Sequence, residues 1–175
     1  MESYLNKILE LGFSKAVYLQ DLTIKCNSDL RAYCNPQQCP KWAKNWVCPP
    51  GCGELAECQK KINEFQKGIL LQSITNLNPP VAEEEYKKLN FEHNMRLKKL
   101  VELLKPEFIK VLPLTSGGCI FCDQCSYPKP CLKPDVKMES LSAFGIDVGK
   151  LCKKANLPFV FRDDIVYFTA LLLLK

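Results

Sequence analysis

Residues 119–131 read Cys-Ile-Phe-Cys-Asp-Gln-Cys-Ser-Tyr-Pro-Lys-Pro-Cys, and the expected architecture of the chain follows from them. Cys119, Cys122 and Cys125 are separated by two residues each, and Cys131 follows after five more. The stretch has no apolar periodicity, so we expect a loop whose structure depends on what its thiols bind. Its spacing follows the logic of the bacterial C-x2-C-x2-C-x3-C-P run, in which thiolates hold a [4Fe–4S] cluster.

Zinc is the competing ligand for this loop. A structural zinc site takes four tetrahedral ligands, which sequences usually supply as two short cysteine pairs well apart. Three cysteines within a seven-residue span suit the several iron corners of a cubane better than a single ion. We therefore predict a [4Fe–4S] cluster and keep zinc as the alternative.

A second cysteine-rich loop is predicted over residues 31–53. Its four thiols, separated by gaps of four, eight and three residues, belong to Cys34, Cys39, Cys48 and Cys52. Four thiolates would complete a second cubane, whereas three would leave one iron open to a substrate, a water or a sulfur atom. Trp42 and Trp46 either shield such a cluster from solvent or pack in the core.

The cysteine content also indicates a compartment. The chain has 175 residues and eleven cysteines, with no basic-then-apolar leader and no apolar run long enough to cross a bilayer. Intracellular thiols are kept reduced, so clustered cysteines there are more often metal ligands or catalytic groups. We expect a cytoplasmic protein without a membrane segment. The three cysteines outside the loops are expected to pack as small hydrophobes: Cys26, Cys58 and Cys152.

Charge and histidine content narrow the functional classes further. The net charge of +5 is too mild to predict a nucleic-acid partner. A set of lysines near the second loop either balances an anionic cluster, docks an acidic redox partner or forms a solvated face; they are Lys129, Lys133, Lys137, Lys150, Lys153 and Lys154. The single histidine, His93, excludes sites that need two or three imidazoles, and we expect it to pack on an apolar helical stripe.

Helices and strands alternate around the two loops. The periodicity predicts helices over 4–11, 55–65, 82–104 and 147–155, with Gly68 ending the second of them. It predicts strands over 16–19, 22–26, 68–74, 108–114 and 166–174. We therefore expect one α/β domain over 1–175, a small mixed sheet flanked by helices, with cluster-binding loops at 31–53 and 117–134.

Two composite motifs place the loop cysteines in a wider context. The first comprises Arg31-Ala-Tyr-Cys34, Cys39 and Trp46-Val-Cys48-Pro-Pro-Gly51. The second comprises Gly117-Gly-Cys119, Cys122, Cys125, Pro130-Cys131 and Glu139-Ser-Leu-Ser-Ala-Phe-Gly145-Ile-Asp-Val148. Together they resemble a family of uncharacterised prokaryotic proteins, catalogued as a domain of unknown function and described as predicted metal-binding and cysteine-rich.

The resemblance spans about residues 15–172. It implies a cytosolic iron–sulfur protein of mainly anaerobic prokaryotes and supplies no agreed reaction. Seven of the eight loop cysteines match the family's motifs, whereas Cys52 falls where many members have another residue.

Three functions fit these features. The leading one is electron transfer through one or two [4Fe–4S] clusters. Cys119, Cys122 and Cys125 would hold one cluster and Cys34, Cys39 and Cys48 the other, with fourth ligands from Cys131 and Cys52, within or across the sites. The second is an enzyme that uses an open iron on a three-cysteine cluster as a Lewis acid or sulfur acceptor. The third is a zinc-stabilised interaction module. The sequence predicts no oligomeric state.

Overall fold

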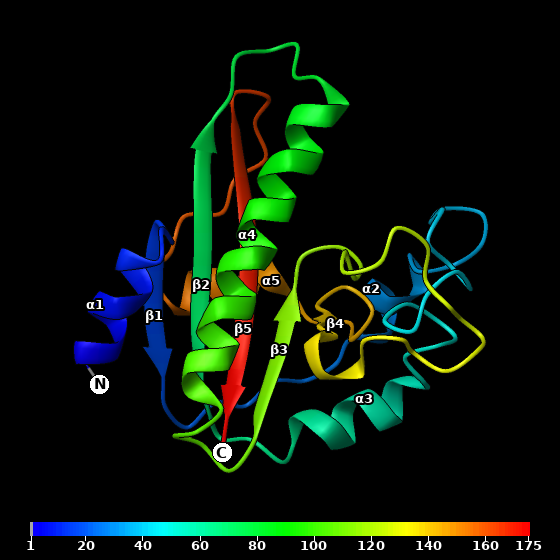
Figure 1. Cartoon of the computed structure of the whole chain (residues 1–175), viewed down its shortest axis with the longest axis horizontal. Helices are drawn as coiled ribbons and strands as arrows, with labels where there is room; N and C mark the ends of the chain where they lie inside the picture. The colour runs from blue at the N-terminus through cyan, green and yellow to red at the C-terminus, as the bar shows by residue number, and fades with distance from the viewer. Residues whose placement is uncertain (1) are drawn as a thin grey trace.

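A computed structural model describes residues 2–175 of the chain. The helices are α1 (Glu2–Glu10), α2 (Ser28–Ala32), α3 (Leu55–Ile62), α4 (Glu83–Leu104) and α5 (Val148–Lys154), with a short 3-10 helix, η1 (Pro134–Val136). The strands are β1 (Lys15–Leu19), β2 (Lys67–Asn76), β3 (Val111–Thr115), β4 (Glu139–Ser140) and β5 (Ile165–Leu174). They form one sheet in the order β1-β2-β5-β3-β4, in which only β3 and β4 run parallel (Figure 1). The predicted α/β class with a small mixed sheet flanked by helices is therefore confirmed.

The two longest strands, β2 and β5, form the centre of the sheet. They pair antiparallel over ten residues each, from Lys67 opposite Leu174 to Asn76 opposite Ile165. Successive side chains of a strand point to opposite faces, and the leucines at the end of β5 fill both cores with this period of two. The continuous apolar run of β5 therefore reflects burial on both sides of the sheet.

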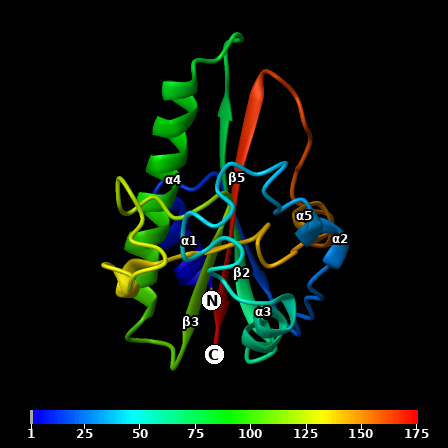
Figure 2. The same ribbon diagram turned by 90° about the vertical axis from the view of Figure 1, so that its right-hand side faces the viewer.

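Helices cover each face of the sheet, as the edge-on view in Figure 2 shows. On one face, α1 and α4 contribute Ile8, Leu97 and Leu100 to a core with the β2 residues Ile69 and Leu71. On the other face the core comes largely from α3, α5 and a buried turn; it includes Cys58, Ile62, Phe144, Leu151 and Cys152. Apolar side chains make up most of both layers, with a few buried polar residues among them.

The predicted strand at 22–26 is wrong as a strand, although its burial pattern was anticipated. Leu22, Ile24 and Cys26 are buried and alternate with exposed neighbours, but the segment joins no strand ladder. The side chain of Gln59 on α3 takes the place of a partner strand. It accepts a hydrogen bond from the Cys26 N–H at 2.7 Å and donates one to the Ile24 carbonyl oxygen at 2.9 Å.

A second correction concerns Gly68, which was expected to end the preceding helix. The helix α3 ends at Ile62, and Gly68 is the second residue of β2. A Cβ atom at this position would lie 3.0 Å from the carbonyl oxygen of Leu172 on the neighbouring strand. Glycine therefore permits a close approach between the central strands rather than a helix end.

The expected apolar stripe of α4 is confirmed, because Leu97, Leu100, Val101 and Leu104 are buried on it. His93 also lies on this buried face and is its one titratable side chain. Its side chain is fully buried between the rings of Phe13 and Phe168, and its Nδ1 atom lies 2.9 Å from the Ser73 hydroxyl. Among the described residues, its Nε2 atom has no hydrogen-bond partner. Burial, reinforced by the nearby Arg96 charge, lowers the pKa of His93 to about 3.

This depressed pKa predicts acid sensitivity of the fold. The ordinary pKa of about 6.5 applies to the unfolded chain, which takes up a proton below that pH while the folded protein stays neutral. Between about pH 7 and pH 5 the native protein should lose about 2 kcal/mol of unfolding free energy more than the His93→Gln variant, and the loss should continue toward pH 3. Urea denaturation at both pH values measures the difference. Equal pH slopes in the two proteins would contradict it.

Candidate metal centre

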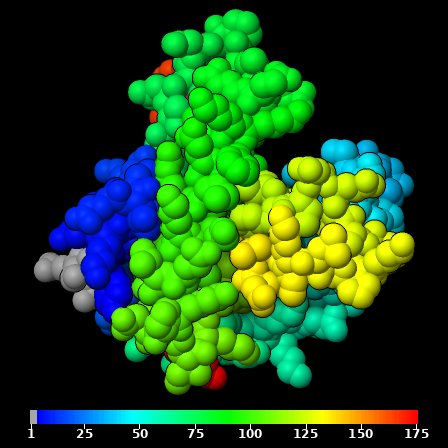
Figure 3. Space-filling model, viewed as in Figure 1, coloured from blue at the N-terminus to red at the C-terminus, as the bar shows by residue number. Residues whose placement is uncertain are grey.

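The two cysteine-rich loops lie side by side at one edge of the sheet, drawn from blue to cyan and in yellow in Figure 1. The indole N–H of Trp46 in the first loop donates to the Lys129 carbonyl oxygen of the second at 2.9 Å. The same indole packs edge-on against Tyr127, with ring centroids 5.0 Å apart. In the space-filling view the loops form a lobe beside the sheet (Figure 3). Trp46 therefore joins the loops instead of packing in either core.

Arg31 holds the first loop in place. It lies on α2, and its guanidinium donates to the Gly53 carbonyl oxygen at 2.8 Å, so it links the two ends of the 31–53 loop. A second donor of the same group reaches the Ala143 carbonyl oxygen in the buried turn after β4. Between these ends the chain folds into successive turns; for example, the Cys39 N–H donates to the Asn35 carbonyl oxygen at 2.9 Å. The loop is thus anchored at its base without any metal.

Three thiols of the first loop influence one another's pKa. Burial raises the pKa of Cys48, and the Cys39 and Cys34 thiols beside it raise that pKa further. Burial likewise raises the pKa of Cys34, with the Cys39 thiol as the second cause. Coulombic effects of this kind extend over several ångströms, so Cys34, Cys39 and Cys48 lie in the same part of the first loop, although no three side chains within residues 2–175 are already arranged to hold a metal ion.

Cys52 lies one turn after Cys48, whose carbonyl oxygen accepts a hydrogen bond from the Cys52 N–H at 3.1 Å. Its side chain is 4% exposed and belongs to the apolar core with Cys58. The Cys58 thiol donates to the Cys52 carbonyl oxygen at 3.8 Å, and the Cys52 thiol donates to the Gly53 carbonyl oxygen at 3.7 Å. A hydrogen bond with the Cys58 thiol, together with burial, raises the pKa of Cys52. The core packing expected for the three cysteines outside the loops is seen, and Cys52 belongs to the same core as all three: Cys26, Cys58 and Cys152.

The second loop surrounds a cavity of about 240 Å³ that opens between the two loops. All four of its thiol-bearing residues line this cavity: Cys119, Cys122, Cys125 and Cys131. Burial raises the pKa of Cys119, and the nearby Cys122 and Cys125 thiols raise it further. Gly117, with φ of +83°, makes the turn into this loop, and a Cβ atom on Gly118 would lie 3.2 Å from the Lys41 side chain. The turn therefore brings the start of the second loop against the first.

The donor set of this cavity suits a metal cluster. All eleven cysteines are free thiols, so none is consumed by a disulfide. One water molecule occupies about 30 Å³ in the liquid, so the cavity offers several times the room that a single ion needs. Within residues 2–175, however, no three His, Cys, Asp or Glu side chains are already arranged to hold a metal ion. Thiolate ligation would therefore require the loops to close further.

The charges around the cavity are mostly positive. Its lining includes one acidic residue, Asp123, and four lysines: Lys41, Lys44, Lys133 and Lys137. Lys133 donates to the Phe121 carbonyl oxygen at 2.7 Å, and Lys137 is paired with the buried Glu139 at 3.0 Å. Sequence reasoning missed Lys41 and Lys44, because they come from the other loop and no local pattern connects them to this one.

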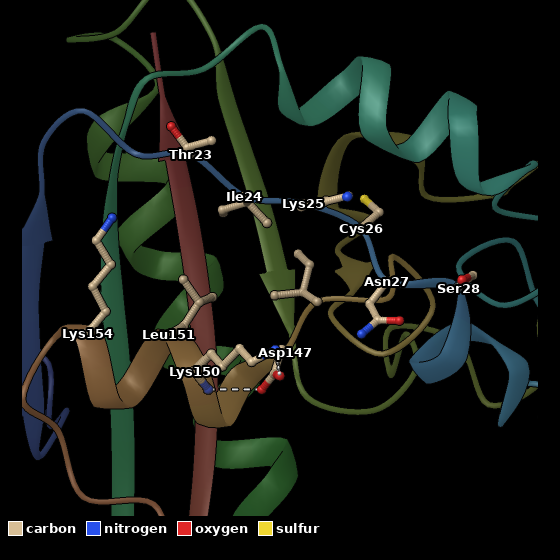
Figure 4. Close-up of a pocket in the computed structure, with 11 residues that line it drawn as sticks. Thr23, Ile24, Lys25, Cys26, Asn27, Ser28, Asp147, Lys150, Leu151 and Lys154 are labelled. Atoms are coloured by element: carbon tan, nitrogen blue, oxygen red, sulfur yellow. Dashed lines mark hydrogen bonds and ion pairs between the residues drawn. The ribbon is translucent and has the colours of Figure 1, made fainter.

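The lysines of α5 do not line this cavity. The expectation that six lysines gather near the second loop is therefore wrong for those on α5. Lys150 and Lys154 line a different cavity of about 420 Å³, together with Lys25 (Figure 4). Strand β4 and the buried turn after it separate α5 from the second loop along the chain. Of the six expected lysines, Lys133 and Lys137 line the cavity of the second loop, and Lys129 lies within that loop.

Comparison with known proteins adds one finding. A family model described as "Predicted metal-binding protein (DUF2284)" matches residues 18–174. No curated protein and no solved structure matches the chain significantly. Among the described helices, none is both long and apolar enough to cross a membrane. The matched range includes both cysteine loops.

Proposed function

Because the chain belongs to the DUF2284 family of predicted metal-binding proteins, we propose that its two loops hold [4Fe–4S] clusters and that it carries electrons in the cytoplasm. One observation carries the proposal: the four cysteines of the second loop line a single cavity closed by the first loop. Cys119, Cys122, Cys125 and Cys131 are the proposed ligands there. Cys34, Cys39 and Cys48 are the proposed ligands of a second cluster.

The chain's own residues supply the setting for this chemistry. A [4Fe–4S] cluster supplies one-electron transfer when bound. Burial keeps the Cys48 and Cys119 thiols protonated in the metal-free protein, so ligation releases their protons. The exposed ammonium groups of Lys41 and Lys44 stabilise the more negative reduced state and so raise the reduction potential.

The position of Cys52 favours a second candidate function. Since Cys52 packs against Cys58 in the core, the first loop offers three neighbouring thiols instead of four. A cubane held by three cysteines keeps one iron open to a substrate or a sulfur atom, which is the arrangement of an enzyme. This candidate differs from electron transfer in that the first cluster should bind small anions or thiols directly.

Chemical analysis of protein purified without oxygen tests the proposal. We expect about eight iron and eight sulfide per chain, little zinc, and a paramagnetic signal of two interacting centres after dithionite reduction. About four iron per chain would support one cluster. Colourless protein with stoichiometric zinc and no acid-labile sulfide would overturn the proposal in favour of a zinc module.

A further inference from the structure

An apolar groove of about 390 Å³ adjoins the cavity of the second loop. It shares Trp46, Cys131 and Lys137 with that cavity, and three prolines complete its walls: Pro128, Pro130 and Pro134. All three prolines are exposed. Leu132, next to Cys131 in the chain, is 74% exposed, so the surface around this proposed ligand is apolar and open.

Several exposed lysines lie around the groove, and few acidic residues lie near them. Lys129 and Lys133 are exposed in the same loop, and Lys41 and Lys44 are exposed at the adjoining cavity. Among the described residues none of these four forms an ion pair, whereas Lys137 is paired with Glu139. The nearby acidic residues are Asp123 and Asp135. The surface therefore combines an apolar centre with a net positive rim.

We propose that this groove and its lysines dock an acidic electron-transfer protein, which exchanges one electron with the cluster of the second loop. The inference rests on the proposed function and names its partner. A partner seated in the groove contacts Cys131 directly. In the forward step the partner's reduced centre loses one electron and the [4Fe–4S] core passes from the 2+ to the 1+ state, with no atom transferred.

The composition of the surface supports a protein partner. Interfaces combine an apolar core with a polar rim, and complementary charge steers association and fixes orientation. The prolines fix the backbone of the docking loop, so binding orders little of it and costs little entropy. The lysine rim, which remains unpaired, then selects partners that carry a negative surface.

The test uses the cluster-loaded protein and a purified acidic bacterial ferredoxin as the probe. We expect the double variant Lys44→Glu/Lys129→Glu to bind oxidised ferredoxin at least about tenfold more weakly by calorimetry. Neither side chain forms an ion pair within residues 2–175, so folding should be preserved. The matched control Lys25→Glu/Lys154→Glu places the same charge change at the separate cavity of Figure 4 and should bind within about twofold of the native protein.

Two further readouts separate this inference from the proposed function. The rate of cluster reduction by ferredoxin should fall with the affinity, and native binding should weaken between about 50 mM and about 500 mM salt. Dithionite, which needs no docking, should still reduce every variant to completion, although the loss of the Lys44 charge lowers the reduction potential of the docking variant. Equal ferredoxin binding by both double variants, or binding insensitive to salt, would overturn the docking surface. A cluster that dithionite cannot reduce would instead overturn the electron-transfer function, while the calorimetry still decides the docking.

Discussion

The Cys122→Ser variant is expected to lose the whole cluster of the second loop, so that iron falls by about four atoms per chain. Cys122 is the middle thiol of the run that begins at Cys119 and ends at Cys125, and all three line one cavity. A tight loop reaches three corners of a cubane only if each thiol is present, and a serine hydroxyl is a poor ligand for iron. Iron and sulfide analysis of anaerobically purified variant measures the loss.

The Cys52→Ser variant is the matched control for this loss. It makes the same atomic change in a cysteine that packs in the core beside Cys58. We expect its iron content, spectrum and potential to equal those of the native protein. Loss of about four iron from Cys52→Ser, or full iron content in Cys122→Ser, would contradict the ligand assignment.

The Gly145→Ala variant is expected to destabilise the fold by about 3 kcal/mol or more. Gly145 has φ of +63°, a conformation that costs an alanine about 1 kcal/mol. The larger cost is steric, because the new Cβ atom would lie 2.5 Å from the backbone oxygen and 3.0 Å from the nitrogen of Asn27. That nitrogen donates to the Gly145 carbonyl oxygen at 2.8 Å, so the clash also disrupts this hydrogen bond. Asn27 caps α2, which leads into the first loop, so iron content should fall as well.

Urea denaturation in oxygen-free buffer, with Gly149→Ala as the control, measures this effect. Gly149 lies inside α5, and a Cβ atom there would meet its nearest neighbour, an Asp147 oxygen, at an ordinary 3.5 Å. An alanine in this helix should be neutral or stabilising by up to about 1 kcal/mol. Equal stability of the two variants would show that the Gly145 turn relaxes without cost.

The elements with strong periodicity were predictable from sequence. The helix expected over 82–104 is α4, and the strand expected over 166–174 is β5, because a stripe or an apolar run specifies burial on its own. The segment at 22–26 shows the limit of this reasoning. Its alternation indicates a half-buried extended chain, but its hydrogen bonds come from Gln59, more than thirty residues further along the chain. The short helix α2, with five residues, and the strand β4, with two, are too short to give a periodic pattern in the sequence.

The sequence predicts which cysteines are candidate ligands better than it predicts which of these thiols lie close together in the folded protein. Spacing alone identifies the eight loop cysteines, but distance along the chain does not say which thiols meet in space. Cys52 is four residues from Cys48 yet packs in the core, because the helix that begins at Leu55 brings Cys58 against it. The contribution of Lys41 to the second cavity depends on the docking of one loop on the other, which no local pattern encodes.

The separation between the two apolar cores and the loop lobe bears on how the protein matures. Zinc fingers are unfolded until their ion binds, because the ion replaces a core that they lack. Here apolar side chains make up most of both faces of the sheet, and Arg31 anchors the first loop through the carbonyl oxygens of Gly53 and Ala143, with the Cys58 thiol within 3.9 Å of its guanidinium. These contacts among the chain's own residues let the polypeptide fold before any proposed cluster is inserted, so that cluster insertion would follow folding. Depletion of iron should accordingly leave a reservoir of intact acceptor protein instead of degraded chains.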